Sequence, residues 1–144
     1  MQISSTTIIP AAAPEIWEVL TDYEDFATWN PFVTNVALDK NGKRARLRVD
    51  LDKHEREHAV EIKLHASHAP GKLAWDLLLA PSWLVSARYA ATLQPHAEGA
   101  ALTQEVRFGG LAKSSFIRAA FRKRVARGLE KMGEALREQM CGAR

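Results

Sequence analysis

The sequence predicts an α+β fold in which a curved antiparallel sheet wraps around one long C-terminal helix. Between residues 33 and 109, apolar residues alternate with polar ones in several short runs, which is typical of strands with one buried face. After Gly109-Gly110 the apolar spacing changes to the helical period and keeps it to about Gln139. A lone amphipathic helix of this length must bury its apolar stripe against the preceding sheet.

The first thirty residues predict a strand followed by two short helices. Residues 2–9 are rich in Ile, Ser and Thr, a composition typical of a strand. Residues 14–21 have helical apolar spacing and begin with a proline, which the first turn of a helix accepts. Asp22 is expected to cap a second helical turn through Trp29. Asn30-Pro31 should end that turn, because proline disfavours a helical residue before it.

Six strands are expected between residues 33 and 109, and the N-terminal strand should join them to make a seven-stranded sheet. Segments typical of turns separate several of these strands: Lys40-Asn41-Gly42-Lys43, Pro70-Gly71 and His96-Ala97-Glu98-Gly99. By strand parity, the inward-facing residues are Ala45, Leu47, Val49 and Leu51; Val60, Ile62 and Leu64; Leu73, Trp75, Leu77 and Leu79; Tyr89, Ala91 and Leu93; and Leu102, Gln104, Val106 and Phe108.

The final helix is expected to cover Phe116 to Arg137. Ser114 or Ser115 can cap its first turn. Its apolar stripe is made of Ile117, Phe121, Val125, Leu129, Met132 and Leu136.

Composition favours one soluble, cytoplasmic domain over residues 1–144. A chain of 144 residues can bury a sizeable core without metals or disulfides, and its 47% hydrophobic and 26% charged residues are ordinary proportions. The single cysteine, Cys141, allows no intramolecular disulfide and fits a reducing compartment. The N-terminus lacks the features of a signal peptide, and no run approaches the ~18 apolar residues of a membrane span.

Four segments of the chain carry a resemblance to known proteins: residues 14–23 (PEIWEVLTDY), 29–32 (WNPF), 108–111 (FGGL) and 128–132 (GLEKM). In these segments the sequence resembles the SRPBCC superfamily, which includes START, Bet v 1-like and polyketide cyclase/dehydratase proteins. The first two resemble that family's first helix and its turn into the second strand, and the last two resemble the junction into the last helix and the middle of that helix. The segments follow the family's order over nearly the whole chain. The resemblance implies the helix-grip fold and, in most members, a cavity.

The resemblance and the inward residues together predict an apolar cavity between the sheet and the last helix. Small residues should leave the space: Ala45, Ala66, Ala87, Ala91 and Gly128. The phenol of Tyr89, the amide of Gln104 and the indole nitrogens should orient a ligand. The predicted ligand-binding residues are Trp29, Phe32, Val49, Ile62, Trp75, Leu77, Tyr89, Ala91, Gln104, Val106, Phe108, Phe121, Val125 and Met132. The alternative is that these side chains fill a solid core.

The segment His54-Glu55-Arg56-Glu57-His58 matches the H-E-x-x-H pattern of zinc peptidases. That chemistry needs both histidines one turn apart on a helix. Here the segment lies between two runs with strand periodicity and has polar flanks, so a solvated hairpin tip without zinc is expected. No Gly-rich phosphate loop or Cys/His zinc spacing is present, and no cofactor is expected.

The final helix is also strongly basic, and its first half has no acidic partners from Lys113 to Arg127. A solvated outer face accounts for most of this charge, since Glu130, Glu134 and Glu138 supply partners in the later half. Transient contact with a membrane surface is the preferred functional alternative. Nucleic acid is not expected, because aromatic residues do not interleave with the basic ones on that side.

Three functions remain open on the sequence alone. The first is binding or carriage of an aromatic, isoprenoid or acyl molecule. The second is a cyclase- or dehydratase-type enzyme that uses the same pocket, and the third is a lipid- or quinone-pathway helper that docks through its basic helix. The carboxylates Asp76 and Glu105 fall on the outward parity, and neither Ser114-Ser115 nor Cys141 has a readable base beside it. The inward strand residues therefore favour binding over catalysis.

Overall fold

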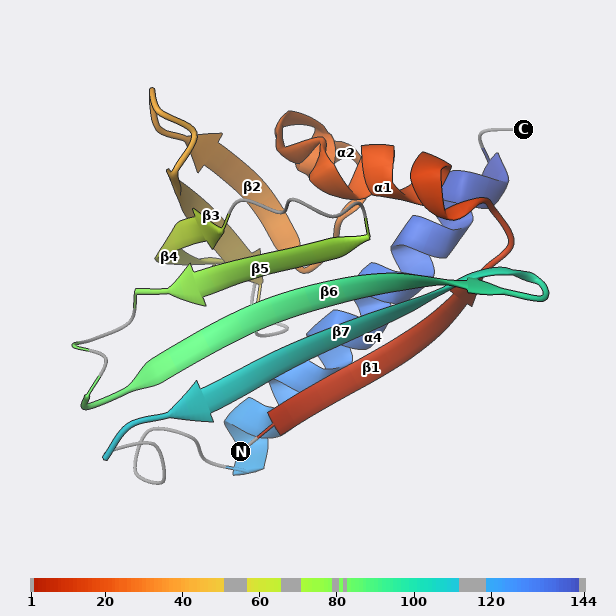
Figure 1. The fold of residues 1–144 in the computed structure, drawn as a ribbon. Helices are drawn as coiled ribbons and strands as arrows, with labels where there is room; N and C mark the ends of the chain where they lie inside the picture. The colour runs from red at the N-terminus through yellow and green to blue at the C-terminus, as the bar shows by residue number, and fades with distance from the viewer. Residues whose placement is uncertain are drawn as a thin grey trace.

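A computed structural model of the chain shows a seven-stranded antiparallel sheet curved around a long C-terminal helix (Figure 1). The structure describes residues 2–50, 57–65, 71–78, 81, 83–111 and 119–142. The strands are β1 (Gln2–Ile9), β2 (Val33–Leu38), β3 (Arg44–Asp50), β4 (Glu57–His65), β5 (Lys72–Leu77), β6 (Ser86–His96) and β7 (Gly99–Gly109). The predicted fold class is confirmed.

The sheet has the strand order β1-β7-β6-β5-β4-β3-β2. Strands β2 to β7 form a meander, and β1 pairs with β7 from the other end of the chain, with Gln2 opposite Arg107 and Ile9 opposite Ala100. Opposite residues in an antiparallel pair share a face of the sheet. The pairing of Trp75 with Tyr89, and of Tyr89 with Val106, therefore places these three side chains side by side on the inner face.

Three helical segments follow β1: α1 (Ala13–Thr21), the 3₁₀ turn η1 (Tyr23–Asp25) and α2 (Phe26–Trp29). The two short helices were predicted, but the expected cap was wrong, because the side chain of Asp22 makes no capping hydrogen bond. Helix α2 ends before Asn30-Pro31 as expected, and the side chain of Asn30 also contributes to this end. Its Oδ1 accepts hydrogen bonds from the backbone N–H groups of Phe32 and Val33, both at 2.9 Å, and so forms the turn into β2.

The C-terminal helix α4 runs from Ala119 to Gly142, and the predicted start at Phe116 lies outside the described residues. The helix covers the predicted range through Arg137 and continues for five more residues. Met140 follows Leu136 by four positions and packs against the core, so the apolar stripe continues for another turn. Within the described residues, no helix has both the length and the apolar character that crossing a bilayer requires.

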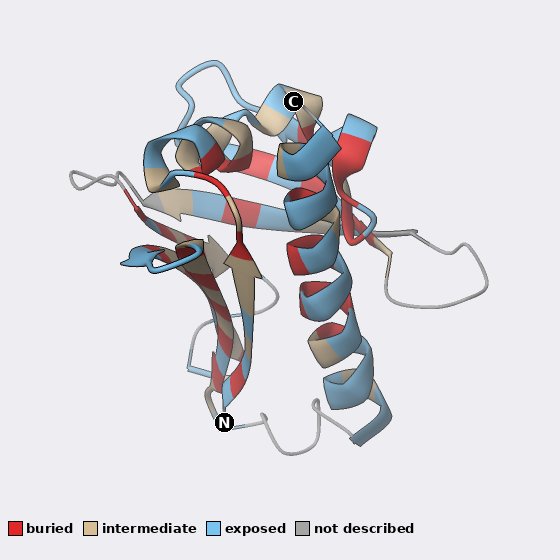
Figure 2. Ribbon diagram, turned by 90° about the vertical axis from the view of Figure 1, so that its right-hand side faces the viewer, coloured by how far each residue is buried: buried red, intermediate tan, exposed pale blue. Residues whose placement is uncertain are grey.

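The core lies between the inner face of the sheet and α4 (Figure 2). Burial alternates along β6 and β7 as the sequence predicted, while exposed residues cover the outer side of α4. Two glycines let the helix approach closely. A Cβ at Gly133 would collide with the side chain of Thr7 on β1, and a Cβ at Gly128 would collide with the ring of Phe32.

The segment that matches H-E-x-x-H does not form a helix over its last two residues. Strand β4 begins at Glu57, so Glu57 and His58 belong to the sheet rather than to a hairpin tip. Residues 54–56 lie outside the described residues. The part that the structure describes therefore lacks the helical geometry on which the zinc-peptidase pattern depends.

Candidate ligand-binding site

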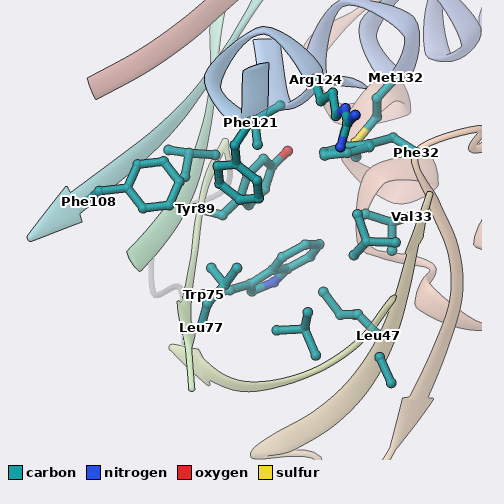
Figure 3. Close-up of a pocket in the computed structure, with 15 residues that line it drawn as sticks. Phe32, Val33, Leu47, Trp75, Leu77, Tyr89, Phe108, Phe121, Arg124 and Met132 are labelled. Carbon is teal, nitrogen blue, oxygen red and sulfur yellow. The ribbon is translucent and has the colours of Figure 1, made fainter. Parts of the chain in front are cut away.

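A cavity of about 450 Å³ lies between the inner face of the sheet and the first half of α4 (Figure 3). This volume is within the range of roughly 300–1,000 Å³ that is typical of small-molecule sites. The described residues that line it are Phe32, Val33, Leu47, Val49, Ala59, Val60, Trp75, Leu77, Tyr89, Val106, Phe108, Phe121, Arg124, Val125 and Met132. Nearly all of these side chains are apolar, so the interior favours apolar molecules.

Most of the residues predicted to bind a ligand do line this cavity. They are Phe32, Val49, Trp75, Leu77, Tyr89, Val106, Phe108, Phe121, Val125 and Met132. The structure brings them together from four strands, the turn before β2 and one helix. Their role in binding remains a prediction.

Four of the predicted residues, Trp29, Ile62, Ala91 and Gln104, do not line the cavity. Ile62, Ala91 and Gln104 do face inward but are packed into the core, with exposed fractions of 0%, 1% and 0%. Trp29 borders a separate depression beside the C-terminal end of α4. Strand parity identifies the face on which a side chain lies, but it does not say where along the strand the helix leaves space.

The predicted origin of the space was also wrong. Ala45, Ala87 and Ala91 are buried away from the cavity, and the space beside Gly128 is filled by Phe32. Ala66, the remaining small residue, lies outside the described residues. Large side chains line the cavity instead, so the curvature of the sheet, rather than a set of small residues, leaves the volume open.

Two pairs of aromatic rings form much of the cavity wall. Trp75 and Tyr89 have ring centroids 4.6 Å apart with an interplanar angle of 31°, and Phe108 meets Phe121 edge-on at 6.0 Å. Behind this wall, the indole Nε1 of Trp75 donates a hydrogen bond of 3.4 Å to the hydroxyl of Tyr23. The indole nitrogen of Trp75 is therefore used within the protein, and the ring presents an apolar face to the cavity.

The hydroxyl of Tyr89 is held by a chain of buried hydrogen bonds. It donates to Oε1 of Gln104 at 2.8 Å, and Nε2 of Gln104 donates to the backbone carbonyl of Leu129 in α4 at 2.9 Å. Burial, with a smaller contribution from nearby Tyr23, raises the pKa of Tyr89 far above its usual value, so the phenol stays neutral. Its single proton is already donated, and toward a ligand the hydroxyl can act only as an acceptor.

Two exposed residues mark the rim of the cavity. Ala59, near the start of β4, and Arg124, on α4, both line the cavity and are both exposed. The opening therefore lies between α4 and the first part of β4. Of the described residues that line the cavity, Arg124 alone carries a charge.

Five lining residues were missed by the sequence analysis: Val33, Leu47, Ala59, Val60 and Arg124. Leu47 and Val60 carried the right signal, since both have inward parity and pair with each other across β3 and β4. Arg124 also carried a signal, because it follows Phe121 by three positions and precedes Gly128 by four. Ala59 has outward parity, and nothing in its strand pattern identifies it.

The strand carboxylates lie on the outer face, as predicted. Asp76 accepts a hydrogen bond of 2.7 Å from Nε of Arg88, its neighbour across β5 and β6. Glu105 pairs with Ser4 of β1 and Ala90 of β6 and has the same outward parity. Among the described residues, no cluster of three His, Cys, Asp or Glu side chains has the geometry to hold a metal ion.

A family model described as polyketide cyclase/dehydrase and lipid transport matches residues 1–137. The chain belongs to the polyketide cyclase/dehydrase and lipid transport family. The predicted superfamily is thereby confirmed. No curated protein sequence matches this family member.

Solved structures show the same fold as this polyketide cyclase/dehydrase family protein. A START superfamily protein from Mycobacterium smegmatis is 16% identical with a TM-score of 0.76, and each chain is covered to 99%. TTHA0849 from Thermus thermophilus is 12% identical with a TM-score of 0.78 and the same coverage. The di-domain ARO/CYC StfQ from the steffimycin biosynthetic pathway is 11% identical with a TM-score of 0.68, over 98% of this chain and 51% of that chain. At these identities the likeness shows the fold alone.

Proposed function

We propose that this protein binds a small, largely apolar molecule with an aromatic, isoprenoid or acyl skeleton in the cavity between the sheet and α4. The observation that carries the proposal is a volume of about 450 Å³ enclosed by apolar and aromatic side chains. Burial of apolar ligand surface is worth ~25 cal/mol per Å² before the costs of association, which is enough for micromolar affinity. The name of the family, which includes lipid transport, agrees with this role.

Binding is preferred over catalysis because of the polar groups that the cavity does contain. Tyr89 is neutral and has already donated its proton, while the guanidinium of Arg124 offers hydrogen-bond donors but no acceptor. Neither group is suited to abstract a proton from a ligand near pH 7. A cyclase- or dehydratase-type reaction is the alternative, and it would have to rely on the shape of the cavity and on stabilisation of negative charge by Arg124.

The test is the binding of a neutral fluorescent probe, N-phenyl-1-naphthylamine, to the purified protein. We expect saturable enhancement of its fluorescence with a dissociation constant in the micromolar range. Leu77→Asp should weaken the probe strongly, because it places a carboxylate against the apolar ligand. Asp76→Asn, on the neighbouring outward position, is the control and should leave binding unchanged. Absence of saturable binding by the wild type would refute the proposed function.

Contact with an anionic membrane surface is a second candidate role. Arg122, Lys123 and Arg127 are exposed on the first half of α4, which begins at the end of the molecule where β7 ends (Figure 1). At that end Trp83 and Leu111 are 66% and 85% exposed, and the N–H of Leu111 donates to the carbonyl of Trp83 at 3.0 Å. Exposed apolar side chains at the same end as uncompensated cations suit a lipid interface.

Cosedimentation with vesicles tests this second role. Vesicles of phosphatidylcholine with phosphatidylglycerol should retain the protein at low salt, and pure phosphatidylcholine vesicles should not. Trp83→Ala and Lys123→Glu should each reduce retention. Equal recovery with both kinds of vesicle would contradict the role of charge.

A further inference from the structure

We infer that the ligand of this cavity is an amphipathic anion, whose negatively charged end, a carboxylate, is bound by Arg124 at the rim while its apolar body lies in the cavity. The inference rests on the proposed function and specifies the chemistry of the ligand. It starts from the mixed character of the site: apolar and aromatic walls with one permanent positive charge among the described lining residues.

The position of Arg124 on α4 sets it apart from the other cations of that helix. Residues three and four apart lie on one face of a helix, so Arg124 shares the cavity face with Phe121 and Gly128. Arg122, Lys123 and Arg127 are exposed but do not line the cavity. The basic half of α4 therefore directs one of its cations to the cavity and the others to the solvent.

The close-up shows how the Arg124 side chain lies. It extends from α4 toward the ring of Phe32, and its nitrogen atoms lie beside that ring at the helix side of the cavity (Figure 3). Phe32 is held there because it packs on Gly128, one turn further along α4. The charged group thus stands next to an apolar surface on one side and open solvent on the other.

Arg124 has no carboxylate partner among the residues that the structure describes. Arg46 pairs with Glu61 and Arg88 with Asp76, both on the outer face of the sheet, and no ion pair between described residues involves Arg124. Along α4 the first acidic residue after Arg124 is Glu130, six positions away, which is not a neighbouring position on a helix. As far as the described residues go, the guanidinium donors are therefore available to a ligand.

This arrangement selects a particular kind of ligand. A guanidinium group binds a carboxylate through two parallel hydrogen bonds, and the adjacent apolar wall strengthens the pairing by excluding water on one side. Because the group lies at the rim, the carboxylate keeps part of its hydration and avoids the full cost of burying a charge. Deeper in the cavity, Tyr89 offers only an acceptor, which would repel an anion. The anionic end is therefore expected at Arg124 and the apolar end against Trp75 and Tyr89.

The experiment compares ligands that differ only in their end group. Decanoate, decyl phosphate and 1-decanol are titrated against N-phenyl-1-naphthylamine bound to the wild type, Arg124→Gln and Arg124→Lys. Arg127→Gln is the matched control, since it removes a cation of the same helix that does not line the cavity.

Decanoate should bind the wild type about three- to tenfold more tightly than Arg124→Gln, because the pair is strong but partly exposed. Arg124→Lys should recover part of the loss, Arg127→Gln should bind as the wild type does, and 1-decanol should bind all four proteins equally. If Arg124→Gln weakens the binding of decyl phosphate more than that of decanoate, the anionic end of the ligand is a phosphate, and its assignment as a carboxylate is overturned.

Two results would overturn the inference as a whole while leaving the proposed function intact. One is equal affinity of decanoate for the wild type and Arg124→Gln. The other is an equal loss of decanoate and 1-decanol, which would show that Arg124 only covers the cavity with its aliphatic stem. If neither the fluorescent probe nor any decyl compound binds the wild type, the proposed function itself fails and the inference fails with it.

Discussion

Replacing a valine that lines the cavity by phenylalanine should leave the protein nearly as stable, although the same change elsewhere in the core should not. Val49 on β3 and Val36 on β2 are both 8% exposed, and both lie on the inner face of the sheet. Val49 lines the cavity and Val36 does not. The two positions are therefore matched in residue type and burial and differ in whether there is space beside them.

The expected magnitudes follow from that difference. At Val49 the added ring atoms can occupy a minor part of a 450 Å³ space, so Val49→Phe should change the free energy of unfolding by less than ~1 kcal/mol. At Val36 the same atoms enter close packing, and the cost should be ~1–3 kcal/mol. For a chain of this length, such a cost lowers Tm by roughly 3–10 °C.

Thermal and urea denaturation, combined with titration of N-phenyl-1-naphthylamine, measure both effects. Val49→Phe should retain its stability and bind the probe more weakly, while Val36→Phe should lose stability and bind the probe with normal affinity once folded. A loss of stability at Val49 equal to that at Val36, with probe binding unchanged, would show that the cavity is closed in solution. Ala91, which faces inward but is fully packed, would not make this distinction.

Three further predictions concern the contacts that surround the cavity. Gly128→Ala should lower Tm because the added Cβ collides with the ring of Phe32, even though alanine is favoured over glycine in a helix by about 1 kcal/mol. Combining it with Phe32→Leu should restore part of the lost stability. Gln104→Leu should lower the free energy of unfolding, measured by urea denaturation, by ~1–3 kcal/mol, because it leaves the hydroxyl of Tyr89 and the carbonyl of Leu129 unpaired. Adding Tyr89→Phe should recover part of this loss. An unchanged urea midpoint in Gln104→Leu would contradict the buried hydrogen bonds. Burial raises the pKa of Tyr89, so the stability that the neutral phenol contributes is complete below the unfolded pKa of about 10 and is lost as pH rises above it. In a pH titration followed by tyrosinate absorbance, Tyr89 should therefore ionise only when the protein unfolds. Ionisation of Tyr89 in the folded protein near pH 10 would contradict this prediction.

The sequence was sufficient for the fold because burial follows the period of each element. Alternation with period two correctly identified the inner faces of β3 to β7, and the change of period after Gly110 identified α4. Helix α4 extends beyond the predicted range because Met140 continues the stripe past Arg137. The cap by Asp22 was wrong because backbone hydrogen bonds, from the N–H of Asp22 to Val19 and from that of Asp25 to Asp22, form the turn without its carboxylate.

The site was less predictable, because a cavity depends on the distance between elements rather than on periodicity. Ala91 and Gln104 have the same parity as Tyr89 and Val106, but they are covered by core packing, whereas the latter pair borders the open volume. Arg124 belongs to the basic half of the final helix, whose charge was interpreted mainly as a solvated outer face. Its spacing from Phe121 would have placed it on the inner edge of the helix.

The pairing of β1 with β7 has a consequence for the order in which the chain can fold. Gln2 lies opposite Arg107, so the first strand to be synthesised waits for nearly the last one before it gains its neighbour. The hairpins of the meander need only local contacts, whereas the β1–β7 ladder closes a very long loop and is entropically costly to form early. Until α4 has also been made, the concave face of the meander exposes Trp75, Tyr89 and Phe108 to water. During synthesis the cavity wall is therefore a surface prone to aggregation, and only the final helix converts it into an interior.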